Sequence, residues 1–361
     1  MTDPLAILGG PRRYIQGPGA LDRIGEFAGE LGDRPFVVAD TVALELLRPR
    51  LAKSLGAAAS FAAFTGECSH PEIARLADAC DAASGDVVIA LGGGKAIDTA
   101  KGVALHRDLP LLVAPTIASN DAPTSRIIVV YDEKHAIAEI LRTRFNPDIV
   151  LVDTAVIAAA PVRFLRAGIG DAISKKFEVE RAVAAGGLNF FQGRSVQLTL
   201  TIAQSCYAEI RAHAAAAIAD VQKQRTSAAV ERIVEANILL SGLAFESGGL
   251  AAAHALTRGF TALAETKAAL HGETVAFGLI VQLVLEERPA DFLAELLAFY
   301  AAIGLPRTLR ELGLAEAGEA QLRAIAGPTC RAAYIGNMGV GIDEDRVVAA
   351  LRRADALGRS G

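Results

Sequence analysis

The chain has 361 residues, enough for two domains, and 52% of them are hydrophobic, enough for a large core. With 36 lysines and arginines against 41 aspartates and glutamates the formal net charge is −5, which gives no electrostatic reason to bind nucleic acid or an anionic membrane. No uninterrupted apolar run reaches the roughly 18 residues of a membrane span, and the four cysteines lack metal-ligand spacing, so we expect a cytoplasmic protein with reduced thiols.

Up to about residue 160, short apolar runs alternate with helical patterns. Strands are expected at 12–17, 34–40, 60–64, 87–91, 110–115, 126–132, 136–140 and 148–152, and helices at 20–31, 41–55, 71–84 and 96–106. This alternation predicts a parallel sheet covered on both faces, with a hairpin-like excursion between the last strands.

Beyond residue 161 strand-like runs nearly vanish. Helices are expected at 171–185, 190–217, 226–241, 246–263, 271–287, 289–303, 315–328 and 343–357. The sequence therefore predicts an α/β nucleotide-type domain over residues 1–160 and an all-helical domain over residues 161–361.

Three glycines and a lysine, Gly92 to Lys95, follow the expected strand 87–91 and precede a helical pattern. Glycines permit a sharp turn and a close approach of a ligand to the backbone, and a helix N-terminus attracts phosphate. The spacing matches neither the dinucleotide fingerprint nor the P-loop. On these residues alone, an ordinary turn and a phosphate cradle remain equally open.

The segment 114–125 follows another strand and is rich in hydroxyl and amide side chains between prolines. It is expected at the carboxyl edge of the sheet, where ligands of open α/β sheets bind. Such residues also favour turns, so a plain turn segment remains the alternative.

One carboxylate and two imidazoles stand out in the helical half. Asp171 follows Gly168-Ile169-Gly170 and is expected to cap the first helix there, His254 lies in an almost wholly apolar helix, and His271 precedes a glycine at a helix start. Two imidazoles and a carboxylate form a catalytic zinc set, but separations this long cannot show that the three converge.

Together these stretches resemble the glycerol dehydrogenase branch of the metal-dependent, so-called iron-containing alcohol dehydrogenase superfamily. The resemblance covers nearly the whole chain. It rests on five stretches of the sequence: residues 92–95 together with 98–101, residues 114–125, residues 168–171, residues 245–255, and residues 271–273 together with 275–278. It implies a dehydroquinate synthase-like fold with an NAD-binding domain, a helical domain, a small-molecule alcohol or polyol substrate, and a homo-oligomer.

The resemblance also implies roles for individual residues. The expected NAD contacts are Asp40 at the ribose, Gly93, Gly94 and Lys95 at the pyrophosphate, and Asp98, Thr116, Ser119, Ser125, Ile127 and Tyr131 around them. Asp171, His254 and His271 would hold Zn²⁺, and Asp121 and His254 would lie beside the substrate. Zinc would act as a Lewis acid on the substrate hydroxyl before hydride transfer to NAD.

Lys175 departs from the family pattern. It stands four residues after Asp171, where iron-using relatives carry a further metal histidine, and residues at that spacing share a helix face. An ammonium there would weaken metal binding unless it pairs with Asp171 or with a substrate carboxylate. The alternative is that Lys175 turns to solvent.

The sequence therefore favours a zinc- and NAD-dependent dehydrogenase of polyols or 1,2-diols, or a reductase of the matching hydroxyketones. The alternative within this enzyme type acts on a hydroxy acid or an amino alcohol, as Lys175 suggests. A dehydroquinate-synthase-like cyclase is more remote, because segment 114–125 lacks the basic residues that a substrate phosphate needs. A non-catalytic NAD- or metal-binding protein is the third class.

Overall fold

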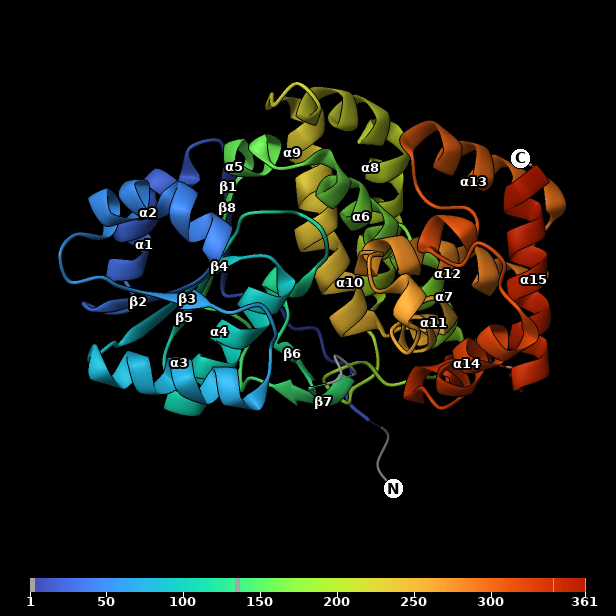
Figure 1. Ribbon diagram of the computed structural model, residues 1–361, viewed down its shortest axis with the longest axis horizontal. Coiled ribbons are helices and arrows are strands. Elements are labelled where there is room, and N and C mark those ends of the chain that lie inside the picture. The colour runs from blue at the N-terminus through green and yellow to red at the C-terminus, as the bar shows by residue number, and fades with distance from the viewer. Residues whose placement is uncertain (1–3, 134–136, 340, 361) are drawn as a thin grey trace. The chain divides into compact units, whose positions relative to one another are not determined.

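The computed structural model describes residues 4–133, 137–339 and 341–360 (Figure 1). The chain forms two compact units. Unit 1 comprises Met1–Gly9, Arg163–Ile218 and Leu243–Gly361, and unit 2 comprises Gly10–Val162 and Ala219–Gly242. The division of the chain at residue 160 into two functional domains stays a prediction.

A six-stranded parallel sheet forms the centre of unit 2 in the described residues. Its strands are β1 (Arg13–Gly17), β2 (Pro35–Asp40), β3 (Ser60–Phe64), β4 (Val87–Gly92), β5 (Leu111–Pro115) and β8 (Ile149–Asp153), in the spatial order β1-β8-β5-β4-β2-β3. The predicted parallel sheet is therefore confirmed.

Helices cover both faces of this sheet, which explains why its central strands are apolar throughout. Figure 1 shows α1 (Ile24–Gly29) and α2 (Thr41–Leu55) on one side, and α3 (His70–Ala82) and α4 (Gly94–Arg107) on the other. The chain leaves β2 toward β3 but leaves β4 toward β5, in the opposite direction. The carboxyl ends of β2 and β4 thus flank the topological switch point, where such sheets bind ligands.

The predicted excursion is a separate antiparallel pair, β6 (Ile127–Tyr131) with β7 (Ile137–Arg142), and β8 returns to the main sheet. Residue 136, where the second strand of the pair was expected to begin, lies outside the described residues. Two helices complete unit 2, α5 (Thr154–Ala159) and α9 (Ala228–Glu235), and a π-helical turn at Ala236–Leu240 follows α9.

From Val162 onward the described residues form helices joined by turns. Besides α9, these helices are α6 (Val162–Ala172), α7 (Lys175–Ala184), α8 (Gln197–Val221), α10 (Ser241–Gly248), α11 (Ala252–Phe260), α12 (His271–Leu285), α13 (Ala290–Ile303), α14 (Glu319–Cys330) and α15 (Glu344–Ser360). This confirms the helical character of the second half.

Several helix boundaries differ from the prediction, and three of the differences have a clear physical reason. Asp171 does not cap a helix but lies in the last turn of α6, because that helix begins directly after Pro161. The expected helix 246–263 is interrupted at Gly249, whose φ of 98° is left-handed. Residues 190–196 are not helical, because the Asn189 side chain accepts hydrogen bonds from the backbone N–H groups of Phe191 and Gly193 and closes a turn.

None of the helices in the described residues is long and apolar enough to cross a membrane. All four cysteines are free thiols, and Cys68, Cys80 and Cys206 are buried.

Candidate active site

The glycine turn of unit 2 lies at the switch point. Gly92 ends β4 with φ of 145°, and a Cβ there would lie 2.5 Å from Asp40 Oδ2 at the end of β2. Gly93 is the extended residue before α4, so the first N–H groups of that helix point to the sheet's carboxyl edge. The turn therefore offers a phosphate both a close backbone approach and a helix N-terminus.

The polar segment after β5 packs against this turn. A Cβ on Gly93 would lie 2.8 Å from the Ile117 side chain, and one on Gly94 would lie 2.8 Å from the Asn120 amide. The Thr116 backbone N–H donates to the carbonyl of Gly92 at 3.1 Å. The structure thus brings together two motifs that sequence reasoning could only treat separately.

Two charged side chains beside the turn, those of Asp40 and Lys95, contact other residues of the chain. Asp40 Oδ1 accepts from the Ala43 N–H at 2.8 Å and caps α2. Lys95 Nζ donates to Glu67 Oε2 at 2.9 Å and lies 4.9 Å from the centroid of the Tyr131 ring. Both side chains remain partly exposed at the sheet edge.

Asp98 and Ser125 serve internal packing. Lys101 is fully buried, and its Nζ donates to Asp98 Oδ1 at 3.3 Å, to Ser125 Oγ at 3.3 Å and to the carbonyls of Ala122 and Ile127. Asp98 Oδ2 accepts from the Val129 N–H. These contacts hold β6 and the polar segment against α4, which accounts for Asp98 and Ser125 structurally.

Asp121 and Ser119 are both buried in the same segment. Asp121 Oδ2 accepts a 2.6 Å hydrogen bond from the hydroxyl of Ser241, at the start of α10. Ser241 therefore fixes the orientation of the Asp121 carboxylate.

In unit 1, close helix crossings at glycines assemble the other cluster. A Cβ on Gly272 would overlap the backbone carbonyl of Ala167, so α6 and α12 touch backbone to backbone beside Asp171 and His271. A Cβ on Gly278 would lie 2.6 Å from the carbonyl of Ala253, beside His254. The glycines explain how residues distant in sequence converge.

Asp171, His254 and His271 form one cluster, with a candidate ligand atom from each within 4.8 Å of the others. Asp171 Oδ1 lies 3.2 Å from His254 Nε2 and 3.9 Å from His271 Nε2. Asp171 is buried, whereas the His271 side chain is 44% exposed and forms the open side of the cluster. Asp171 Oδ2 is buried without a hydrogen-bond partner in the described residues.

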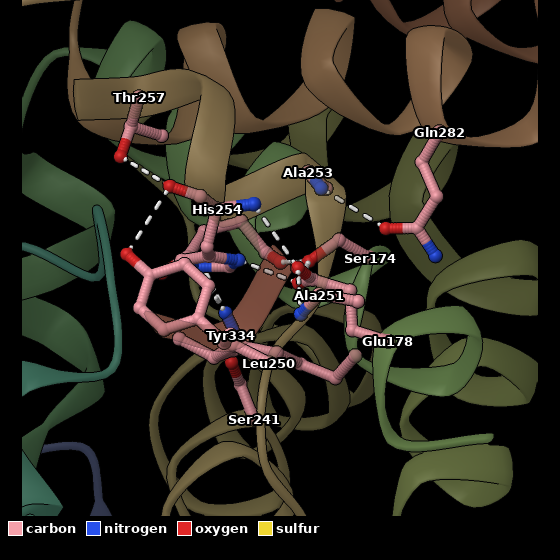
Figure 2. Close-up of polar contacts among 12 residues, drawn as sticks. Ser174, Glu178, Ser241, Leu250, Ala251, Ala253, His254, Thr257, Gln282 and Tyr334 are labelled. Atoms are coloured by element: carbon pink, nitrogen blue, oxygen red, sulfur yellow. Dashed lines mark hydrogen bonds and ion pairs between the residues drawn. The ribbon is translucent and has the colours of Figure 1, made fainter. Parts of the chain in front are cut away.

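Glu178 supports His254, as Figure 2 shows. Its Oε2 lies 2.5 Å from His254 Nδ1 and accepts from the Ser174 hydroxyl, while Oε1 accepts from the backbone N–H groups of His254 and Ala251. Glu178 thereby caps the start of α11 and orients the imidazole. At the far side Thr257 and Tyr334 donate to the His254 carbonyl.

Both buried carboxylates are held in their charged form. Burial alone would raise the pKa of Asp171, but the Lys175 ammonium and the His254 hydrogen bond hold it well below its usual range. Burial likewise opposes ionisation of Glu178, and His254 lowers the pKa of that carboxyl below its usual value. Two buried anions therefore require buried positive charge nearby.

Lys175 supplies such a charge. Its side chain is fully buried, and its Nζ contacts Asp171 Oδ1 and lies 3.0 Å from His254 Nε2. The expectation that it turns to solvent is wrong, and of the alternatives weighed from the sequence, pairing with Asp171 is the one observed.

Comparison with known proteins identifies the family. The family model of the iron-containing alcohol dehydrogenases matches residues 11–154. A glycerol dehydrogenase from Pseudomonas putida is 41% identical over 97% of this chain and 97% of its own, and a glycolaldehyde reductase from Halobacterium salinarum is 40% identical with the same coverage. The solved structure of a probable glycerol dehydrogenase from Sinorhizobium meliloti has a TM-score of 0.94 at 38% identity, covering 98% of this chain and 99% of that one.

The chain therefore belongs to the iron-containing alcohol dehydrogenase family and is an enzyme of the NAD-dependent alcohol dehydrogenase class. The fold and the family expected from the sequence are confirmed.

The family name implies a metal, and the cluster fits one only in part. Asp171, His254 and His271 supply donors suited to a divalent cation. Lys175, however, places an ammonium on two of these three donors. With the lysine in this position the residues do not fit a divalent metal, and the zinc expected from the sequence stays a prediction.

Sequence reasoning missed three supporting residues: Glu178, Ser241 and Lys101. Ser241 is a polar residue within an apolar stretch, a signal that marks a buried polar contact without revealing its partner, whereas Glu178 and Lys101 lie in helices with other charged residues and nothing in the sequence sets them apart.

Proposed function

We propose that this enzyme transfers a hydride between NAD and a polyol or 1,2-diol, or reduces the matching hydroxyketone. The observation that carries the proposal is the cluster of unit 1, in which candidate ligand atoms of Asp171, His254 and the partly exposed His271 lie within 4.8 Å of one another. A compact polar cluster with one exposed member suits a substrate with adjacent hydroxyl groups. The names of the similar proteins, glycerol dehydrogenase and glycolaldehyde reductase, agree with such substrates.

NAD is proposed to bind at the glycine turn of unit 2. Its pyrophosphate would lie on Gly93, Gly94 and the N-terminus of α4, with Lys95 beside it. The second oxygen of Asp40, alongside Gly92, would accept from the adenosine ribose hydroxyls and repel a 2′-phosphate. We therefore propose NAD rather than NADP as the cofactor.

For the other residues expected to contact NAD, we propose a direct role for those near the turn and an indirect role for the rest. Thr116 and Ser119 belong to the segment that packs on it, and the Tyr131 ring lies beneath the Lys95 ammonium. For Asp98, Ser125 and Ile127 we propose an indirect role, because Lys101 already engages the side chains of the first two and the carbonyl of the third.

The atoms and electrons of the proposed reaction balance. A hydride leaves the carbinol carbon for the nicotinamide ring, and the hydroxyl proton passes to a protein group or water, so that alcohol and NAD become carbonyl compound and NADH. Asp121 and His254 are the proposed substrate-side residues. Ser241 holds the first and Glu178 the second, and such preorganisation lowers the barrier without involving them in bond changes.

A substrate panel tests this proposal. NAD reduction is measured with glycerol, ethylene glycol, 1,2-propanediol, simple alcohols, 2-hydroxy acids and amino alcohols, each with NAD and with NADP. The expected result is the highest kcat/KM for a 1,2-diol with NAD. Preference for a hydroxy acid, or equal use of NADP, would contradict it.

Hydroxy acids and amino alcohols are the second candidate substrates, and that candidacy depends on Lys175 as the partner of a substrate carboxylate. In the structure its ammonium is buried and engaged by Asp171, which favours the polyol. A cytoplasmic location and a homo-oligomeric state are further proposals, the first supported by the four free thiols.

A further inference from the structure

Lys175 occupies the position that a metal ion would need. Its Nζ contacts Asp171 Oδ1 and lies 3.0 Å from His254 Nε2, and these two atoms lie 3.2 Å apart. A divalent metal binds such donors at about 2.0–2.2 Å, so any position bonded to both lies within about 4 Å of the ammonium nitrogen. The metal and the lysine would therefore compete for the same lone pairs.

The positive charges of the lysine and of a metal ion exclude one another from this site. The side chains of Lys175 and Asp171 are shielded from water, being 0% and 1% exposed. Like charges repel strongly at such a distance when no water screens them. A metal ion could enter only if the lysine side chain withdrew.

The surroundings favour the lysine in its observed place. Lys175 begins α7 four residues after Asp171, which lies in the last turn of α6, and the short turn between the two helices brings the lysine side chain to the carboxylate. Its Nζ also lies 5.8 Å from the centroid of the Phe245 ring, an additional attraction for a cation. Withdrawal would leave Asp171 buried without its ammonium partner.

We propose that Lys175 is the resident cation of this cluster: its ammonium replaces a divalent metal between Asp171 and His254, and the enzyme works without a metal there. Lys175 then acts as a positioning residue, which fixes the Asp171 carboxylate and the His254 imidazole for the substrate. This inference builds on the proposed polyol oxidoreductase but concerns only the cation in its site.

Zinc binding tests the proposal without substrate or NAD. The purified wild-type chain and three variants are incubated with excess zinc and desalted, and zinc per chain is measured by mass spectrometry, with affinity from calorimetry. Lys175→Ala removes the ammonium, and Lys175→Ala/His271→Ala also removes a donor. Lys176→Ala is the matched control, because that neighbouring lysine pairs with Glu180 outside the cluster.

The wild type and Lys176→Ala are expected to retain far less than one zinc per chain. Lys175→Ala is expected to retain one zinc per chain and to bind it at least about 100-fold more tightly, because a strong repulsion has been removed. The double variant is expected to lose this gain, which would place the new zinc at the cluster.

Stoichiometric zinc in the desalted wild type, or equal zinc affinity in the wild type and Lys175→Ala, would overturn the proposal. If Lys175→Ala does not fold, the zinc content of the wild type and the response of its activity to chelator still decide. A negative substrate panel would defeat the polyol proposal and leave the zinc result standing, so the two failures are distinguishable.

Discussion

At the residue scale, Glu178 is the side chain on which the position of His254 depends most. It accepts from the imidazole and from two backbone N–H groups at the start of α11. Glu178→Gln keeps the size but removes the charge and one acceptor oxygen. We expect kcat/KM to fall by about 10- to 100-fold, as for other groups that orient an active-site imidazole.

The control for this prediction is Glu180→Gln on the same helix, since Glu180 is 39% exposed and pairs only with Lys176 among the contacts described. Steady-state kinetics with NAD and a 1,2-diol give the comparison. Equal losses in the two variants would contradict a specific role for Glu178.

The buried pair of Lys101 and Asp98 makes a prediction about stability. Lys101→Met leaves the Asp98 carboxylate buried without its ammonium, and we expect the free energy of unfolding to fall by about 3–5 kcal/mol. The double variant Lys101→Met/Asp98→Asn is expected to lose less, because no charge is then left unpaired. Urea unfolding measures both, and a double variant less stable than the single one would count against the assignment.

At the element scale, the crossing of α6 and α12 depends on a missing side chain. A Cβ on Gly272 would overlap the Ala167 carbonyl, and backbone cannot move aside as a flexible side chain can. Gly272→Ala should lower the free energy of unfolding by about 1–3 kcal/mol and reduce activity, because Asp171 and His271 flank the crossing. Gly336→Ala, with open space around the new methyl group, should leave both unchanged.

The glycine turn between β4 and α4 gives a prediction about the affinity for the cofactor. Gly92→Ala forces a methyl group onto the Asp40 carboxylate at a φ that only glycine adopts readily. Strain of about 1–3 kcal/mol corresponds to roughly 5- to 150-fold weaker binding of NADH. Fluorescence titration with NADH measures this, and Gly29→Ala, which has free space around it, is the control. Unchanged affinity in Gly92→Ala would argue against a cofactor site at the turn.

Sequence patterns predicted most elements because local signals marked their ends. The helix 41–55 and the strand 60–64 match α2 and β3 at both ends. Helix 171–185 matches α7 except at its start, because the glycines Gly168 and Gly170 belong to α6, where Gly170 brings that helix against α12. A close packing contact of this kind depends on a partner helix far away in the chain, which no local pattern contains.

At the scale of the whole molecule, the family resemblance predicted which residues converge, and the chain's own pattern did not. Asp171 and His254 lie 83 residues apart, so periodicity cannot bring them together. The direction of Lys175 was equally out of reach, because the expected single helix is two helices joined by a turn between Asp171 and Lys175, and no local pattern shows what covers that turn. Only the packed helices show that this face is buried and that its cation is an ammonium.

The central claim is that a polyol oxidoreductase of this family uses Lys175 where a metal would otherwise lie. The most direct test measures the rate of NAD reduction by 1,2-propanediol against zinc content, in wild-type samples that range from chelator-treated to zinc-loaded. We predict measurable turnover whose rate does not vary with zinc per chain. A rate that vanishes with the metal and rises in proportion to it would contradict the claim.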